Sequence, residues 1–203
     1  MRRALFALVL SAAVVPALAL QSSAAPAAEA SAVKAGTYKV DPDHTQVGWT
    51  LNHLGISLYR GLFGDISGTL TIDPAKPEAA AVSVSIPVAK VVTTSQALND
   101  HLLKDDFFDV ARFPTATFTS TKVVATGSSA TITGNLTLHG VTKPVVLDAK
   151  FTGMADHPMS KKPNIGFEAS TKIKLKDFGM GKYVPMLSDD VDLWITAAFE
   201  RQG

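Results

Sequence analysis

The sequence contains no cysteine among its 203 residues. This absence excludes disulfide bonds, thiolate metal ligands and cysteine nucleophiles together. A chain of this length is nevertheless long enough for one domain held by its core alone. An excess of one charge is also missing, because 19 Lys and Arg residues stand against 18 Asp and Glu residues. We therefore expect no nucleic-acid partner and no attraction to an anionic membrane.

Motifs that carry catalysis or bind metals are absent as well. The five histidines form no H-E-x-x-H or other close pair. They are His44, His53, His101, His139 and His157. Asp100 and Asp105, close to His101, could in principle serve acid–base chemistry, although solvation of a helix surface explains these acids more simply. We expect no metal, no resident cofactor and no catalytic residue.

Long apolar runs are confined to the N-terminus. Arg2 and Arg3 precede an apolar run over 4–20, in which Ala17-Leu18-Ala19 fits an A-x-A cleavage site. This order is typical of a secretory signal peptide, which we assign to residues 1–19, with cleavage as late as residue 30 as the alternative. Cleavage after Ala19 leaves 17 basic and 18 acidic residues, a net charge of −1. Residues 20–36 predict a disordered lead-in, and no later segment predicts stable membrane insertion.

From residue 37 onward, apolar and polar residues alternate with the period of half-buried β-strands. Val47, Trp49 and Leu51, for example, alternate with small or polar neighbours. About eight such segments, separated by turn signals, predict a sandwich or a closed meander barrel. The pattern breaks over 90–121, where Thr93-x-x-Gln96 has the form of a capping box and predicts a short helix near 95–104. So short a helix must dock on the rest of the chain to persist.

The expected inward faces carry no charged residue and mix large side chains with small ones, among them Gly68, Gly134, Ala149, Ala169 and Ala197. Two interiors are compatible with this mixture. One is tight packing of large residues against small ones, and the other is an elongated apolar cavity. A cavity would suit a long hydrocarbon chain, because each buried CH₂ group contributes about 0.8 kcal/mol.

Several ordered motifs resemble those of the YceI-like family, over roughly Thr37 to Glu200. They are Asn99-Asp100-His101-Leu102, Asp106-Phe107-Phe108-Asp109-Val110, Phe113-Pro114, the run from Gly134 to Val145, and Asp177-Phe178-Gly179-Met180. The resemblance implies an all-β fold, an extended eight-stranded antiparallel lipocalin-like β-barrel with an apolar pore. It also implies a periplasmic or secreted protein that binds polyisoprenoids, isoprenoid quinones or other long-chain amphiphiles, and it is compatible with a homodimer.

Two positions depart from the family pattern, in which arginine often stands where this chain has Asn99 and Leu175. A neutral quinone or fatty amide fits these positions at least as well as an anionic pyrophosphate head group. The combined prediction is a periplasmic carrier, with the binding domain at residues 37–203, that is not an enzyme. The alternatives are a lipid-modifying enzyme using His101 with Asp100 or Asp105, and a filled barrel that serves as an interaction or stress-response module.

The candidate site residues follow from this prediction. The wall of the pore is expected to contain Trp49, Leu51, Phe63, Leu70, Val84, Phe118, Leu136, Phe151, Phe167, Ile173, Leu193 and Ile195. Leu98, Leu102, Phe107 and Phe108 are expected to cap or flank it, and His53, Asp100 and His101 are candidates for polar positions at its rim or for structural anchors.

Overall fold

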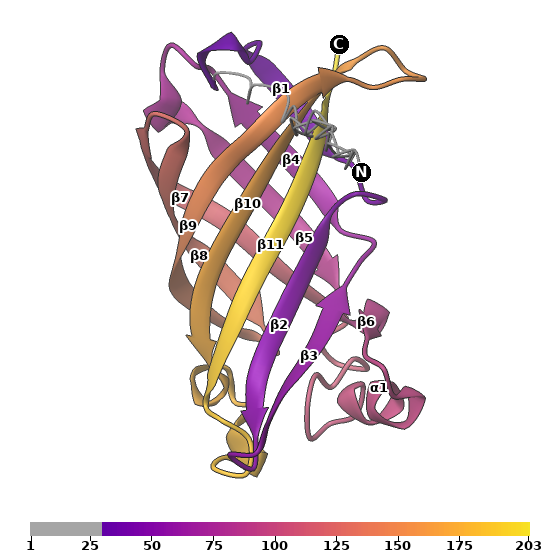
Figure 1. Ribbon diagram of the computed structural model, residues 1–203. Helices are drawn as coiled ribbons and strands as arrows, with labels where there is room; N and C mark the ends of the chain where they lie inside the picture. Colours follow the sequence, from indigo (N-terminus) through magenta and orange to yellow (C-terminus); the bar gives the residue numbers. More distant parts are fainter. Residues whose placement is uncertain (1–29) are drawn as a thin grey trace, which may run out of the picture.

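Eleven antiparallel β-strands form a single sheet that closes on itself in the computed structural model, which describes residues 30–203 (Figure 1). The strands are β1 (Gly36–Val40), β2 (Gln46–His53), β3 (Ser57–Phe63), β4 (Ser67–Ile72), β5 (Ala81–Pro87), β6 (Val91–Val92), β7 (Thr115–Thr126), β8 (Ser129–Leu138), β9 (Val141–Asp156), β10 (Pro163–Lys174) and β11 (Asp190–Arg201). The predicted signal peptide lies outside the described residues. Ala30–Ala32 form a short 3₁₀ helix and Val33 is buried, so the predicted lead-in to residue 36 overlaps a structured segment.

The eleven strands form the eight staves, or walls, of the barrel, because three walls each consist of two consecutive strands with a break between them. β11 pairs with β2 along its first half and with β1 near its end, so β1 and β2 together form one wall. In the same way β3 continues into β4, and β5 continues into β6. The walls then follow one another in chain order, and the pairing of β1 with β11 closes the ring. The predicted eight-stranded antiparallel barrel is therefore confirmed.

The first interruption is held to the neighbouring wall by a buried threonine. Where β11 changes partner from β2 to β1, the hydroxyl of Thr45 donates to the carbonyl of Ala198 at 3.2 Å and accepts from the Ala198 N–H at 3.0 Å. The N–H of Asp41 donates to the same carbonyl at 2.9 Å. These contacts satisfy backbone groups that would otherwise be buried without partners. One ion pair joins the other two interruptions. Asp65 lies between β3 and β4, Lys90 lies between β5 and β6, and the two side chains are 2.8 Å apart.

The predicted alternation of apolar and polar residues matches the inner and outer faces of most strands. In β11, for example, Val191 and Phe199 are buried and Trp194 lies on the outer face. In β7 a bulge between Ser120 and Lys122 reverses the alternation, so that Phe118 and Val123 both face inward. β3 was not predicted as a strand of its own, because the exposed Leu58 places an apolar residue on its outer face.

The segment between β6 and β7 seals the wall at one end of the barrel. No strand among the described residues pairs with the far side of β6, and the helix α1 (Gln96–Leu102) lies there instead (Figure 1). The helix is confirmed, but its N-cap is Ser95, whose hydroxyl accepts from the N–H of Leu98 at 3.3 Å. Thr93 takes a different role from the predicted capping box. Both its N–H and its hydroxyl donate to the side-chain oxygen of Asn99 at 2.7 Å, which ties the helix to the strand end.

Two short 3₁₀ helices, Leu175–Phe178 and Gly181–Tyr183, fill the connection from β10 to β11 at the same end of the barrel. The opposite end holds the β4–β5 and β9–β10 connections and the C-terminus (Figure 1). In the described part of the chain, no helix has the length and apolar character needed to cross a membrane. The barrel thus has one end covered by two long segments and one end bordered by short turns.

Candidate functional site

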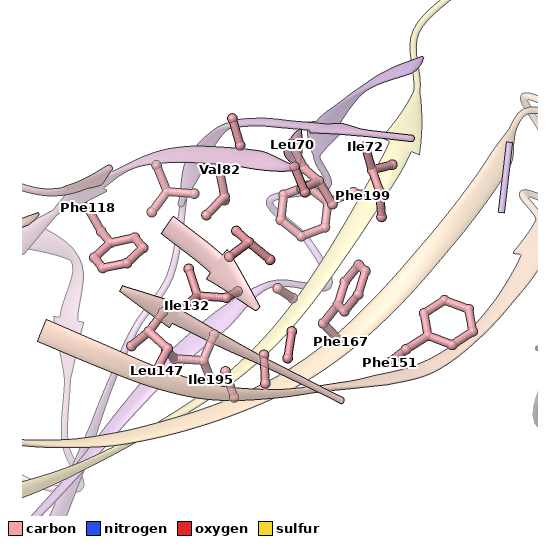
Figure 2. A pocket seen from close by; sticks show the side chains of 18 of the residues that line it. Leu70, Ile72, Val82, Phe118, Ile132, Leu147, Phe151, Phe167, Ile195 and Phe199 are labelled. Atoms are coloured by element: carbon pink, nitrogen blue, oxygen red, sulfur yellow. The ribbon is translucent and has the colours of Figure 1, made fainter. Parts of the chain in front are cut away.

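The interior of the barrel contains a cavity of about 380 Å³. Residues of every wall line it, and Figure 2 shows Leu70, Phe118, Ile132 and Phe167 reaching into the same space from different strands. Its volume lies within the range of roughly 300–1,000 Å³ that is typical of small-molecule sites. The barrel is therefore not filled by its own side chains in this region.

No charged side chain of the described residues lines this cavity. The few polar residues in its lining include Thr45, Thr171, Ser128 and Ser129, and the Thr45 hydroxyl is already engaged with Ala198. The lining therefore offers apolar area and little that could bind a charged group. Such a surface gains most from a hydrocarbon chain, since the free energy scales with the apolar area removed from water.

Small residues create the space. Ala149, Ala169 and Ala197 stand on three neighbouring strands, where Ala169 pairs with Ala149. Gly134 has a different function, because a Cβ atom at this position would lie 2.3 Å from the Phe118 ring. Gly134 therefore leaves room for the Phe118 ring, which packs over β8 as part of the cavity lining.

The open end of this cavity is bordered by turns at the end of the barrel that carries the C-terminus. Pro74, Pro77 and Ala80 come from the β4–β5 connection, and Ser128 comes from the β7–β8 turn. Ala30, at the start of the described chain, also belongs to the lining. None of these mouth residues was among the predicted site residues, because they lie in connections where the alternation of the strands gives no signal.

A second cavity of about 100 Å³ lies toward the covered end of the barrel. It shares Val47, Ile86, Leu136 and Leu193 with the larger cavity, so the two lie end to end. The insert and the β10–β11 connection contribute Leu102, Phe107, Phe108, Leu175, Met180 and Leu187, and most of the remaining lining comes from the strands. Leu175, Met180 and Leu187 of this connection were not among the predicted pore residues, because they lie in or beside 3₁₀ helices and an irregular segment and not within a strand.

The predicted pore residues can now be placed. The larger cavity is lined by Leu70, Val84, Phe118, Leu136, Phe151, Phe167, Leu193 and Ile195. The smaller is lined by Trp49, Leu51, Phe63, Leu102, Phe107, Phe108 and Ile173, together with the shared Leu136 and Leu193. Leu98 lines neither cavity and is a partly buried residue that packs against the core. Contact of any of these residues with a ligand stays a prediction.

The predicted polar residues lie outside both linings. His53 is exposed at the end of β2, and Asp100 is exposed on α1, where it accepts a hydrogen bond from Gln96 at 2.8 Å. The pairing of Asp100 or Asp105 with His101 was wrong. The ring Nε2 of His101 lies 2.9 Å from Asp106 Oδ2 instead, because the turn after α1 brings residue 106 back toward the helix.

Asp106 joins the insert to the β10–β11 connection. Its Oδ2 accepts from the hydroxyl of Tyr183 at 2.5 Å, and Lys182 Nζ lies 3.6 Å away. The hydrogen bond from Tyr183, followed by the one from His101, lowers the pKa of Asp106 from 3.8 to about 2. The adjacent Phe107 stacks on Tyr183 with ring centroids 5.1 Å apart. This polar cluster is a structural anchor that holds Phe107 and Phe108 over the smaller cavity.

The described residues contain no group of three or more His, Asp or Glu side chains placed to hold a metal ion.

The fold and the cavities together define a closed β-barrel with an apolar interior that opens at one end. Comparison with known proteins assigns this barrel to a family. The chain belongs to the YceI-like domain family, whose model matches residues 38–199.

Individual relatives agree with this assignment. The chain is 45% identical over 170 residues to Protein YceI of Salmonella arizonae, covering 83% of this chain and 88% of that protein. It is similar to the crystal structure of the Campylobacter jejuni YceI protein, with 37% identity, a TM-score of 0.67, and coverage of 75% of this chain and 90% of that one. A polyisoprenoid binding domain from Saccharophagus degradans shares the fold, with a TM-score of 0.66 and 15% identity over 83% of this chain and all of that one.

Proposed function

We propose that this protein is an exported carrier that binds one long-chain amphiphile, a polyisoprenoid, an isoprenoid quinone or a fatty-chain molecule, inside its barrel. The observation that carries the proposal is the cavity of about 380 Å³, whose lining contains no charged side chain. A chain placed there would gain roughly 0.8 kcal/mol for each CH₂ group removed from water. The polyisoprenoid binding of the structurally similar Saccharophagus degradans domain supports the proposal.

A binding role agrees better with the geometry than catalysis does. The acid–base residues of the enzyme alternative, Asp100, Asp105 and His101, line neither cavity. His101 is engaged with Asp106, and the rings of Phe107 and Tyr183 stack beside that pair. The predicted signal peptide supports a periplasmic location, where a carrier would keep an apolar chain away from water.

Lipid extraction followed by mass spectrometry tests the proposal directly. We expect the purified protein to release a long-chain amphiphile in a ratio near one molecule per barrel. After delipidation, it should bind prenylated quinones with an affinity that rises with tail length until the cavity is full. The matched control is the same quinone head group without a tail, which should bind at least a hundredfold more weakly. Absence of extracted lipid, together with equal binding of tailed and tail-free quinones, would refute the carrier function.

A further inference from the structure

We propose that Thr171 binds the polar group of the ligand, and that this group is an uncharged oxygen function such as a ketone, an ester or an alcohol. This inference rests on the proposed function, because it assumes an amphiphile inside the barrel. It adds the place of the polar group, its chemical class and the direction of the chain. The polar group would lie where the two cavities meet, and the long chain would run from there toward the open end.

Thr171 stands at the junction of the two cavities. Along β10, the inward residue before it, Ala169, lines only the larger cavity, and the inward residue after it, Ile173, lines only the smaller one. Thr171 pairs with Leu193 of β11, which borders both cavities. Thr171 therefore lies deep in the barrel, at the inner end of the larger cavity.

The hydroxyl of Thr171 is accessible from the cavity. The residue faces inward, because it lines the larger cavity while its neighbours Ser170 and Lys172 are exposed on the outer face. Its hydroxyl takes part in no side-chain hydrogen bond within residues 30–203, and it is not one of the five buried side-chain atoms of these residues that lack a partner. An oxygen without a partner that is not buried keeps accessible surface. On the inner wall of a closed barrel, this surface borders the cavity.

The other polar side chains of the larger cavity are engaged or lie at its rim. The Thr45 hydroxyl is bound to Ala198, and Ser128 and Ser129 are exposed at the turn that borders the open end. The smaller cavity is lined by aliphatic, aromatic and thioether side chains. A polar group that enters the barrel therefore finds its hydrogen-bonding side chain at position 171.

A single hydroxyl among apolar residues selects an uncharged oxygen group. It can donate to a carbonyl oxygen and can accept from an alcohol. It cannot compensate a phosphate or a carboxylate, because no charged side chain of residues 30–203 lines either cavity and a buried charge needs a partner. A pure hydrocarbon is also disfavoured at this place, because it would cover the hydroxyl and leave it without a partner.

The smaller cavity limits what can lie beyond the polar group. Its volume is about 100 Å³, whereas a cavity of roughly 150 Å³ holds benzene, so it accommodates about four carbon atoms. On the other side of Thr171, β11 runs about 20 Å from Leu193 to Phe199 near the open end, beside the larger cavity. We therefore expect the oxygen function close to one end of the ligand, with the long part of the chain directed toward the open end.

Three chain molecules of equal length test this assignment. They are an alkane, a ketone with its carbonyl next to one end, and a ketone with its carbonyl at the middle. Each is titrated into the delipidated wild-type protein, Thr171→Val and Thr196→Val. Valine keeps the shape of threonine and removes the hydroxyl. Thr196 is exposed on the outer face of β11 and supplies the matched control.

The wild-type protein should bind the end ketone most tightly of the three. Thr171→Val should weaken the end ketone about fivefold, or about 1 kcal/mol, and the middle ketone less than about twofold. The alkane should bind Thr171→Val as tightly as the wild type or more tightly, and Thr196→Val should change none of the three. Equal changes for the end ketone and the alkane in Thr171→Val would overturn the role of Thr171.

The infrared band of the bound carbonyl gives a second readout that does not depend on affinity. A hydrogen bond from Thr171 lowers the stretching frequency, so the ¹³C-labelled end ketone should absorb at a lower frequency in the wild type than in hexane or in Thr171→Val. Thr196→Val should give the wild-type band. A wild-type band at the hexane frequency would overturn the role of Thr171 while leaving the carrier function intact. If none of the three compounds binds the wild-type protein, the carrier function itself fails.

Discussion

Filling the larger cavity with a side chain separates a ligand pore from an ordinary core. Ala169 of β10 lines the cavity between Ala149 and Ile195 on the adjacent strands. The substitution Ala169→Phe places a six-carbon ring in this space. Because a benzene molecule occupies a cavity of about 150 Å³, the ring would take roughly two fifths of the 380 Å³. Such a ring enters open space, so the free energy of unfolding should stay constant or rise.

The expected loss of ligand affinity follows from the displaced chain. A ring of this size would displace roughly four to six CH₂ groups of a bound ligand, and each is worth about 0.8 kcal/mol. The total of about 3–5 kcal/mol corresponds to at least a hundredfold weaker binding. Ser170→Phe is the matched control, since residue 170 is exposed on the outer face of the same strand. It should bind the ligand as the wild type does.

Urea unfolding of the delipidated protein and titration with a prenylated quinone supply the two measurements. Overpacking of a filled core typically costs about 1–3 kcal/mol. A loss of stability in that range for Ala169→Phe, with quinone binding unchanged, would show that the barrel interior is a packed core. The larger cavity would then not be the ligand site. Unchanged stability together with lost binding would support its assignment as the ligand site.

Three further perturbations address the parts that shape the cavity. Phe108→Ala removes the edge contact with Phe63 at 5.4 Å and should lower the free energy of unfolding by about 2–4 kcal/mol, measured in urea; a change below about 0.5 kcal/mol would show that the insert is not docked through this ring. Because the folded-state pKa of Asp106 is depressed to about 2 from 3.8, its contribution is present above pH 3.8 and is lost as the pH falls through about 2. We expect this loss to reach about 2 kcal/mol in wild type and to be missing in Asp106→Asn, and equal acid profiles of the two proteins would contradict the anchor. Gly134→Ala would bring a Cβ atom to 2.3 Å from the Phe118 ring and 2.6 Å from the Thr119 carbonyl oxygen, so its midpoint of thermal unfolding should drop by several degrees, as calorimetry would show.

The barrel was predictable from the sequence because its walls alternate regularly. Val191, Leu193, Ile195 and Phe199 stand two or four residues apart, and burial on one face imposes this spacing. The motifs around α1 also predicted a segment that closes the barrel. β3 escaped prediction, because its exposed Leu58 places an apolar residue on the outer face and breaks the pattern.

The polar contacts were less accessible to sequence reasoning. Asp106 pairs with Tyr183, 77 residues away, and only the path of two irregular connections brings them together. The break between β1 and β2 at Thr45 was not predicted for the same reason, because its hydrogen-bond partner Ala198 is 153 residues away in the sequence. The spacing of apolar residues along a strand shows which face of the sheet each residue occupies. It does not show which distant residue lies opposite it.

The pairing of β11 with both β1 and β2 has a consequence for the order in which the barrel is completed. During synthesis, one edge of the first wall has no partner until the last strand, Asp190–Arg201, has been made. Until then the growing sheet exposes unpaired backbone groups that could pair with another chain. The final step joins residues separated by about 150 positions, and such long-range closure is slow. A chain that ends before Asp190 would lack the strand that turns the sheet into a closed ring.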